Sequence, residues 1–398
     1  MRAESLEQTG QLARWRQQVA EKAKALQDEL VEFSEKLHAH PELGWEEHQA
    51  AEWTAQLMEK HGFTVERHYL GFPTAMRAVY GNGAHRVGLM AEYDALPELG
   101  HACGHNIISA TSCAAAIALA QVADEAGLHV QLYGTPAEEG GGGKIELLKR
   151  GAFQDLDLAL MAHPAPVDSA QANPYAVAHH HVEYRGRAAH AAAYPEQGIN
   201  ANDAFIVAQV ALGLMRQQLP AGTRVHGIQT NGGQAPNAIP GKTEGRWYVR
   251  AQNLVELEEL ETRVERCFEA GAVATGCELE ITPESEPYSE FRTDLRALAI
   301  YQRHAQALGR RFDAPAEQAT MNRASTDMGN VSQVVPAIHP YIGLGCYPIS
   351  NHQPEFASEC VGPAANQAIH DGSIALALTS LDYLIAEADF PAAQGPQA

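Results

Sequence analysis

The stretch RVGLMAEYDALPELGHACGHN, residues 86–106, carries the pattern from which the rest of the sequence is interpreted. Residues 86–97 read as an apolar strand that ends in polar residues. Cys103 and His105 lie two positions apart, and His101 shares their parity, so in an extended segment all three side chains would point to the same face. Such a cysteine–histidine pair can bind one metal ion or bridge two. Taken alone, such a pair is more often a buried thiol and a hydrogen-bonded core histidine than a metal site.

The plan of a strand followed by polar residues repeats along the chain. HVQLYGTP (129–136) and DLALMAHPAP (157–166) read as two further strands, the second ending in His163, and an Ala-rich helix is predicted over 109–127. Helices are also predicted within 5–62, with a break where proline and glycine interrupt the pattern. Strands that alternate with helices predict an α/β fold whose strand ends carry the polar residues.

The pattern changes between residues 178 and 290. The elements there are predicted in the order strand, helix, strand, strand, helix, strand, which is typical of a compact ferredoxin-like α+β domain. The α/β pattern then returns. We therefore predict a catalytic domain formed by residues 1–177 and 291–398, interrupted by an inserted domain formed by residues 178–290.

Composition argues against several classes of partner. The chain has 398 residues, a formal net charge of −21 and a pI near 5.3, and no block of Lys and Arg that could neutralise phosphates, which argues against binding nucleic acid or an anionic membrane. Residues 1–40 are charged throughout, so neither a signal peptide nor a membrane anchor is predicted. Six cysteines occur without a CxxC pair, which favours reduced thiols and a cytoplasmic location. A small molecule is the expected partner.

Two adjacent glutamates, Glu138 and Glu139, precede a run of glycines. Adjacent carboxylates in such a turn point in different directions, so one can bind a metal ion while the other takes the proton of a water held by that ion. The alternative is a pair of solvated surface carboxylates. His163 and His352 are weak signals separately, because the sequence holds 19 histidines. Together the candidate ligands offer nitrogen, oxygen and sulfur donors that suit zinc or manganese; they are Cys103, His105, Glu139, His163 and His352.

Five motifs in order along the chain resemble one family of enzymes. The sequence is similar to the co-catalytic metallopeptidases and amidohydrolases that include aminoacylases and glutamate carboxypeptidases, and most similar to their cysteine-containing amidohydrolase branch, with p-aminobenzoyl-glutamate hydrolase and β-alanyl-lysine type dipeptidases. The resemblance implies a mixed-sheet, zinc-peptidase-like α/β catalytic domain with an inserted ferredoxin-like domain, and a homodimer formed through the insert. The motifs are AEYDALPELGHACGHN (91–106), TPAEEGGGG (135–143), MAHP (161–164), GRAAHAAAYPEQGINANDA (186–204) and GGQAPNAIP (232–240).

The resemblance also implies roles for individual residues. Glu138 matches the general base, and Asp94 matches an aspartate that orients a ligand from behind the site. Where the carboxypeptidase branch has a ligating histidine, this chain has Glu92, so its metal set depends on the cysteine–histidine pair instead. The implied ligands of two divalent ions are Cys103, His105, Glu139, His163 and His352.

Residues of the insert are implied to reach the substrate. His190 and Asn237 can stabilise an oxyanion, and the planar fork of Arg250 suits a substrate carboxylate. Each has a structural alternative: a helix cap, a turn and an exposed ion pair, respectively. The resemblance further places Thr326 and Asp327 in loops that line the substrate pocket. The three histidines at 179–181 are not interpreted as a metal site, because alternate residues of a strand face opposite ways.

These observations favour a metal-dependent hydrolase of the amide bond of small N-acyl or N-aroyl amino acids, with Glu138 as general base. One alternative is a dipeptidase that acts on unblocked dipeptides such as β-alanyl-lysine. Another is a binding protein that has kept the fold without catalysis. Retention of Glu138 together with every implied ligand argues against the last of these.

Overall fold

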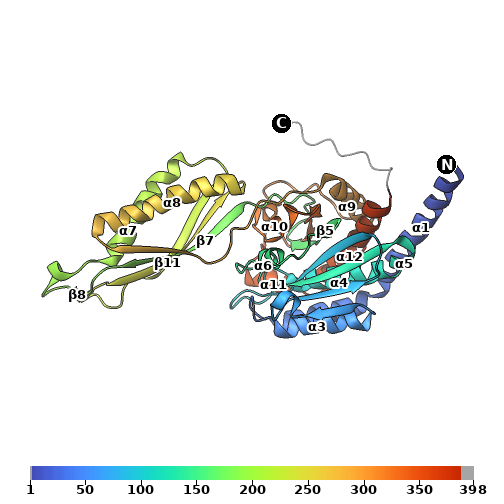
Figure 1. Cartoon of the computed structure of the whole chain (residues 1–398), viewed down its shortest axis with the longest axis horizontal. Helices are drawn as coiled ribbons and strands as arrows, with labels where there is room; N and C mark the ends of the chain where they lie inside the picture. Colours follow the sequence, from blue (N-terminus) through green and yellow to red (C-terminus); the bar gives the residue numbers. More distant parts are fainter. Residues whose placement is uncertain (1, 387–398) are drawn as a thin grey trace. The chain divides into compact units, whose positions relative to one another are not determined.

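The computed structural model describes residues 2–386. The described chain separates into two compact units. Residues up to Asn173 together with those from Phe291 onward form the first, which we call the catalytic unit, and Pro174–Glu290 form the second, the inserted unit (Figure 1). The predicted boundaries at 178 and 290 lie close to these. Each unit has a hydrophobic core of its own.

The catalytic unit is built on a six-stranded mixed sheet. Its strands lie in the order β1-β2-β4-β3-β5-β13, with the neighbours from β4 to β13 parallel and the pairs β1/β2 and β2/β4 antiparallel. The central β3 and β4 are buried over most of their length, as expected of parallel strands covered on both faces. The bounds are Thr64–Arg67 for β1, Met76–Tyr80 for β2, His85–Glu92 for β3, Leu128–Thr135 for β4, Leu158–Leu160 for β5 and Ala337–Ile338 for β13.

Helix α4 occupies the centre of this unit. Every one of its residues is buried, and its many alanines allow it to pack on β3 and β4 and against α12. No helix of the described chain combines the length and the apolar character needed to cross a membrane. The longer helices of the unit are α1 (Arg2–Ala25), α2 (Gln27–Ala39), α3 (His48–Lys60), α4 (His105–Ala120), α9 (Leu295–Ala307) and α12 (Pro363–Ile385).

Residues 101–105 do not form the extended segment that was predicted. Residues 101–103 form a turn, and Gly104 follows with φ +84°, so α4 begins at His105 rather than at residue 109. A glycine is required at this point, because a Cβ on Gly104 would come within 2.4 Å of the Pro164 ring. The expectation that His101, Cys103 and His105 share one face of an extended segment is therefore wrong. The last two are brought together by a helix start.

The third predicted strand is also divided. The chain leaves the main sheet after β5, and His163 begins a separate strand, β6 (His163–Ala165), which pairs with β14 (Tyr341–Gly343) in a two-stranded sheet. Met161 and Ala162 separate β5 from β6, and Pro166, which lacks an N–H group, directly follows the end of β6. His163 therefore opens a strand instead of ending one.

The inserted unit has the predicted ferredoxin-like topology. Its antiparallel sheet has the order β12-β7-β11-β9, and helices α7 and α8 cover one face of it (Figure 1). Alternate residues of β11, such as Trp247 and Val249, are buried and belong to the same core as Phe205 and Phe268 from the helices. The elements are β7 (Ala176–Arg185), α7 (Ala201–Met215), β9 (Arg224–Asn231), β11 (Lys242–Ala251), α8 (Leu254–Thr275) and β12 (Glu278–Pro283).

Candidate active site

The parallel strands of the catalytic unit end at one edge of the sheet, where polar side chains gather. Asp94 follows β3, and Glu138 and Glu139 follow β4. His163 follows β5 by a short link, and His105 stands at the first position of α4. Residues far apart in the sequence meet here because parallel strands place their carboxyl ends side by side.

The five implied metal ligands form two groups at this edge. The ligand atoms of Cys103, His105 and His163 lie within 4.8 Å of one another, as do those of Cys103, Glu139 and His352. Cys103 Sγ is 3.4 Å from His163 Nε2, and His352 Nε2 is 3.3 Å from Glu139 Oε1. Because Cys103 belongs to both groups, its sulfur would be available to an ion held by either of them.

His352 lies in a loop that comes late in the sequence, in the part of the catalytic unit that follows the insert. Its backbone N–H donates to the carbonyl of Ala102 at 2.9 Å, and the neighbouring Asn351 side chain donates to the carbonyls of Cys103 and Pro164. The loop is therefore anchored to the segments that carry the other ligands.

Asp94 orients two of these residues at once. Its Oδ1 lies 3.0 Å from His105 Nδ1, and its Oδ2 accepts the backbone N–H of Glu139 at 2.9 Å. Burial works against both charges of the first pair, yet the Asp94 carboxylate raises the pKa of His105 and the imidazole lowers the pKa of Asp94. The bond through Nδ1 leaves Nε2 as the atom of His105 that faces the other ligands.

The surroundings of His105 Nε2 fit a cation. This atom is buried without a hydrogen-bond partner among the described residues, and oxygens of Glu92, Glu138 and Glu139 lie 3.6, 3.9 and 4.0 Å from it. Burial raises the pKa of Cys103 well above its usual range, so the sulfur becomes a thiolate only beside a strong positive charge. The mixture of sulfur, nitrogen and oxygen donors suits divalent zinc or manganese.

The surroundings of the two adjacent glutamates shift their pKa values in opposite directions. Burial and the nearby carboxylates of Glu92 and Glu139 raise the pKa of Glu138 well above its usual value. Burial acts on Glu139 in the same direction, but His352 outweighs it and lowers the pKa of Glu139. A carboxyl group with a raised pKa exchanges a proton more readily near neutral pH, and a neighbour with a lowered pKa stays ionised, which is the arrangement expected of a proton carrier next to a metal ligand.

Glu92 belongs to a buried charged cluster that the sequence did not reveal. Lys144, at the start of α6 (Gly143–Lys149), donates from Nζ to Glu92 and, at 2.7 Å, to Asp327, while its backbone N–H donates to the other oxygen of Asp327 at 2.8 Å. Burial alone would lower the pKa of Lys144, but Asp327 and Glu92 raise it, so the lysine remains charged. The only sign of this cluster in the sequence is the position of Lys144 directly after the glycine run.

The two loop residues implied to line the pocket are both buried. Thr326 and Asp327 precede α10 (Met328–Ser332), with exposures of 4% and 0%. Both oxygens of Asp327 accept from Lys144, and the Thr326 hydroxyl accepts the N–H of Met328 at 3.2 Å. Their contact with a substrate stays a prediction.

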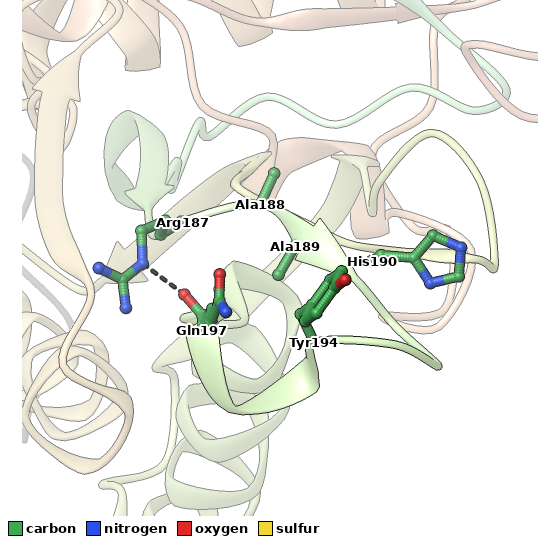
Figure 2. A pocket seen from close by; sticks show the side chains of 6 residues that line it. All are labelled: Arg187, Ala188, Ala189, His190, Tyr194 and Gln197. Atoms are coloured by element: carbon green, nitrogen blue, oxygen red, sulfur yellow. Dashed lines mark hydrogen bonds between the residues drawn. The ribbon is translucent and has the colours of Figure 1, made fainter.

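His190 and Asn237 are neighbours within the inserted unit. His190 lies on β8 (Ala189–His190), which pairs with β10 (Ala238–Ile239), and the carbonyl of Asn237 accepts the N–H of Ala191. His190 Nδ1 accepts the N–H groups of Ala192 and Ala193, which leaves Nε2 as the donor atom. His190 lies at one end of a pocket (Figure 2), whose lining residues are Arg187, Ala188, Ala189, His190, Tyr194 and Gln197.

Arg250 lies on β11, and burial lowers the pKa of its guanidinium. Its Nε donates to His226 Nε2 at 3.2 Å. The three histidines at 179–181 form no metal group within the described residues: His179 packs on aromatic rings, and His180 pairs with Glu261 at 2.8 Å. The roles predicted for His190, Asn237 and Arg250 in binding the substrate stay predictions.

Comparison with known proteins identifies the family. Residues 176–275 match the model of a peptidase dimerisation domain. The fold is similar to a Bacillus subtilis structure described as a dinuclear metal binding peptidase from the M20 family, with a TM-score of 0.68 and 20% identity, covering 91% of this chain and 99% of that one. Over 386 residues the sequence is 39% identical to a Mus musculus Xaa-Arg dipeptidase, covering 93% of this chain and 89% of the relative. This chain belongs to the M20 family.

Other M20 relatives extend the similarity. One of the chains of the Escherichia coli p-aminobenzoyl-glutamate hydrolase is 32% identical over 272 residues, covering 63% of this chain and 56% of that protein. The family resemblance and the mixed-sheet fold with an inserted α+β domain are thus confirmed, and this M20 chain is an amide hydrolase.

Proposed function

We propose that this M20 hydrolase cleaves the amide bond of small dipeptides that carry a free amino terminus and a basic C-terminal residue. The convergence of Cys103, His105, Glu139, His163 and His352 around the carboxyl ends of parallel strands, with Glu138 beside them, is the observation that carries the proposal. The metal identity that we propose is zinc or manganese, with two ions per chain.

In this proposal each residue of the site has a separate role in hydrolysis. When bound, the divalent ions polarise the scissile carbonyl and lower the pKa of an attacking water. Glu138 accepts the proton of that water and returns it to the leaving amine. Asp94 keeps His105 in the orientation that presents Nε2. His190 and Asn237 are proposed to stabilise the oxyanion, and Arg250 to bind the substrate carboxylate.

Two observations favour a basic dipeptide as substrate. The Mus musculus and Homo sapiens relatives, at 39% and 36% identity, are both named Xaa-Arg dipeptidases. The net charge of −21 also favours a cationic substrate over an anionic one, because the field of the whole protein concentrates ions of opposite sign. The second candidate, an N-acyl or N-aroyl amino acid, is favoured by the Escherichia coli relative named p-aminobenzoyl-glutamate hydrolase.

A paired substrate panel separates these candidates. Protein loaded with zinc, manganese or cobalt is incubated with β-alanyl-lysine and alanyl-arginine, with their N-acetylated forms, and with p-aminobenzoyl-glutamate, and amino-acid release is measured. We expect kcat/KM for the unblocked basic dipeptides to exceed the other values by about 10-fold or more, since a site built for a polar group rejects an analogue that lacks it. Faster cleavage of the acylated compounds would transfer the assignment to the aminoacylase type.

We also propose that the chain forms a homodimer through the inserted unit. Ile206, Val210 and Leu214 lie four residues apart on one side of α7 and are 52%, 58% and 71% exposed. Ile228, on the edge strand β9, is 64% exposed. An apolar helix stripe and an open strand edge support association with a second copy.

Charge on this stripe tests the dimer. The double variant Val210→Glu, Leu214→Glu is expected to shift the sedimentation coefficient from that of a dimer to that of a monomer, because the carboxylates would be buried unpaired. Val334→Glu serves as the control, since Val334 is 53% exposed but lies in the catalytic unit. A dimer that persists in the double variant would refute this interface.

A cytoplasmic location is the remaining part of the proposal. All six cysteines are free thiols, and four of them are buried. Reduced thiols in a chain of this kind support a reducing compartment.

A further inference from the structure

Glu47 is a buried carboxylate that the proposed chemistry does not use. It stands at the residue before α3 but makes no side-chain bond to the start of that helix, and its exposure is 0%. Instead, Oε1 accepts the backbone N–H of Ala137 at 2.7 Å, across 90 positions of the sequence. Glu47 is therefore hydrogen-bonded to the turn that carries Glu138 and Glu139.

Ala137 is the residue on which this turn depends. Its φ of +52° lies in the left-handed region, which is unfavourable for a residue with a Cβ. Its carbonyl accepts the N–H groups of Gly141 at 3.1 Å and Gly143 at 3.4 Å. Because Glu47 binds its N–H and the glycine loop binds its carbonyl, Ala137 is held from both sides, and the direction of the next two side chains follows from it.

The loop that ends in Glu47 also contacts the other side of the site. The carbonyl of Glu42 accepts the N–H of Ala95, the residue after Asp94, at 2.8 Å. A Cβ added to Gly44 would come within 3.1 Å of the Ala137 Cα and 3.8 Å of Asp94 Oδ2. The loop therefore packs against both strand-end segments that supply the carboxylates.

We propose that Glu47 is a positioning residue for hydrolysis: its carboxylate fixes the left-handed turn at Ala137 and thereby the relative orientation of Glu138 and Glu139. This inference rests on the proposed function for its effect on turnover. It does not rest on that function for its effect on the metal ligand Glu139, so the two can be tested separately.

The test compares three substitutions in the full-length protein. Glu47→Gln keeps an acceptor oxygen for the Ala137 N–H and nearly the same volume, whereas Glu47→Leu removes the acceptor. Glu46→Leu is the matched control, because Glu46 is the adjacent side chain and is exposed. We measure kcat and KM on the best substrate of the panel, the visible absorption spectrum of the cobalt-loaded protein, and thermal unfolding.

We expect Glu47→Leu to lower kcat by about 10-fold to 100-fold with KM changed less than about threefold, since small misplacements of catalytic groups have effects of this size. Its cobalt spectrum is expected to differ from that of the wild type, because the Glu139 ligand is displaced. Glu47→Gln is expected to keep both kcat and the cobalt spectrum near the wild-type values. Glu46→Leu is expected to change neither.

A second variant keeps the inference testable if Glu47→Leu does not fold. Gly44→Ala places a methyl group against Ala137 without altering Glu47, and it is expected to lower kcat and change the cobalt spectrum in the same direction. Wild-type kcat and an unchanged cobalt spectrum in folded Glu47→Leu or Gly44→Ala would overturn the inference. A kcat and a cobalt spectrum of Glu47→Gln that depart from the wild type as far as those of Glu47→Leu would also overturn it. If the wild type cleaves no substrate of the panel, the proposed function fails and the cobalt spectra alone decide the role of Glu47.

Discussion

Replacing Glu138 by glutamine is expected to lower kcat by roughly 10²-fold to 10⁴-fold, the range found when a general base is removed. The amide cannot accept a proton from water, but it keeps the size of the carboxylate. Glu138 lies outside the two groups that contain Cys103, although it forms a third group of possible ligands with Glu92 and His105. With the ions held by the two groups that contain Cys103, as proposed, the metal content should stay at the wild-type value. The measurement pairs kcat on the best substrate with metal analysis of the same sample by mass spectrometry.

The control for this prediction lies on the neighbouring helix. Glu146→Gln removes a carboxylate that pairs with Lys149 at 3.0 Å on the surface of α6, and it should leave kcat unchanged. Undiminished hydrolysis by Glu138→Gln would refute the assignment of the base. A loss of activity accompanied by a loss of metal would show that Glu138 is a ligand instead.

Replacing Cys103 by serine is expected to remove metal and activity together. The thiol belongs to both ligand groups, and loss of an outer partner of a ligand alone costs roughly 10-fold to 100-fold in metal affinity, so loss of the shared ligand should cost more than about 100-fold. We expect fewer than about one ion per chain after dialysis and a matching fall in kcat. Metal analysis against Cys267→Ser, a half-buried thiol of the inserted unit, gives the comparison.

The same thiol predicts how metal binding depends on pH. Burial raises the pKa of Cys103, so the ion must displace its proton, and affinity should rise with pH in the wild type. In Cys103→Ser this dependence should weaken. Full metal content in the serine variant would contradict the assignment of Cys103 as a metal ligand.

Much of the architecture was predictable because it follows from local patterns. Apolar runs that end in polar residues placed Asp94, Glu138 and Glu139 at strand ends, and parallel pairing then brings such ends together. The order of strands and helices from 178 to 290 likewise sufficed for the ferredoxin-like insert, because each element carries its own periodicity.

Two predictions fail where the backbone departs from the local pattern. Gly104, with φ +84°, precedes the start of α4 at His105, and the strand that was predicted to end in His163 is interrupted at residues 161–162. The glycine is visible in the sequence, but the sequence does not show that a helix begins directly after it. The apolar pattern of residues 157–163 gives no sign of the interruption before His163.

The buried supports of the site could not be predicted from one sequence. Lys144 meets Glu92 and Asp327 only after folding, across 52 and 183 positions respectively. Glu47 meets Ala137 across 90 positions, from a segment that reads as an ordinary turn. Such contacts depend on tertiary structure, and no local spacing encodes them.

X-ray absorption at the zinc edge of the zinc-loaded protein tests most directly whether this set of side chains forms a metal centre. We predict a sulfur shell at about 2.3 Å beside nitrogen and oxygen neighbours at about 2.0–2.2 Å, with the sulfur shell absent from Cys103→Ser. A first shell of nitrogen and oxygen alone in the wild type would contradict a metal centre that includes Cys103.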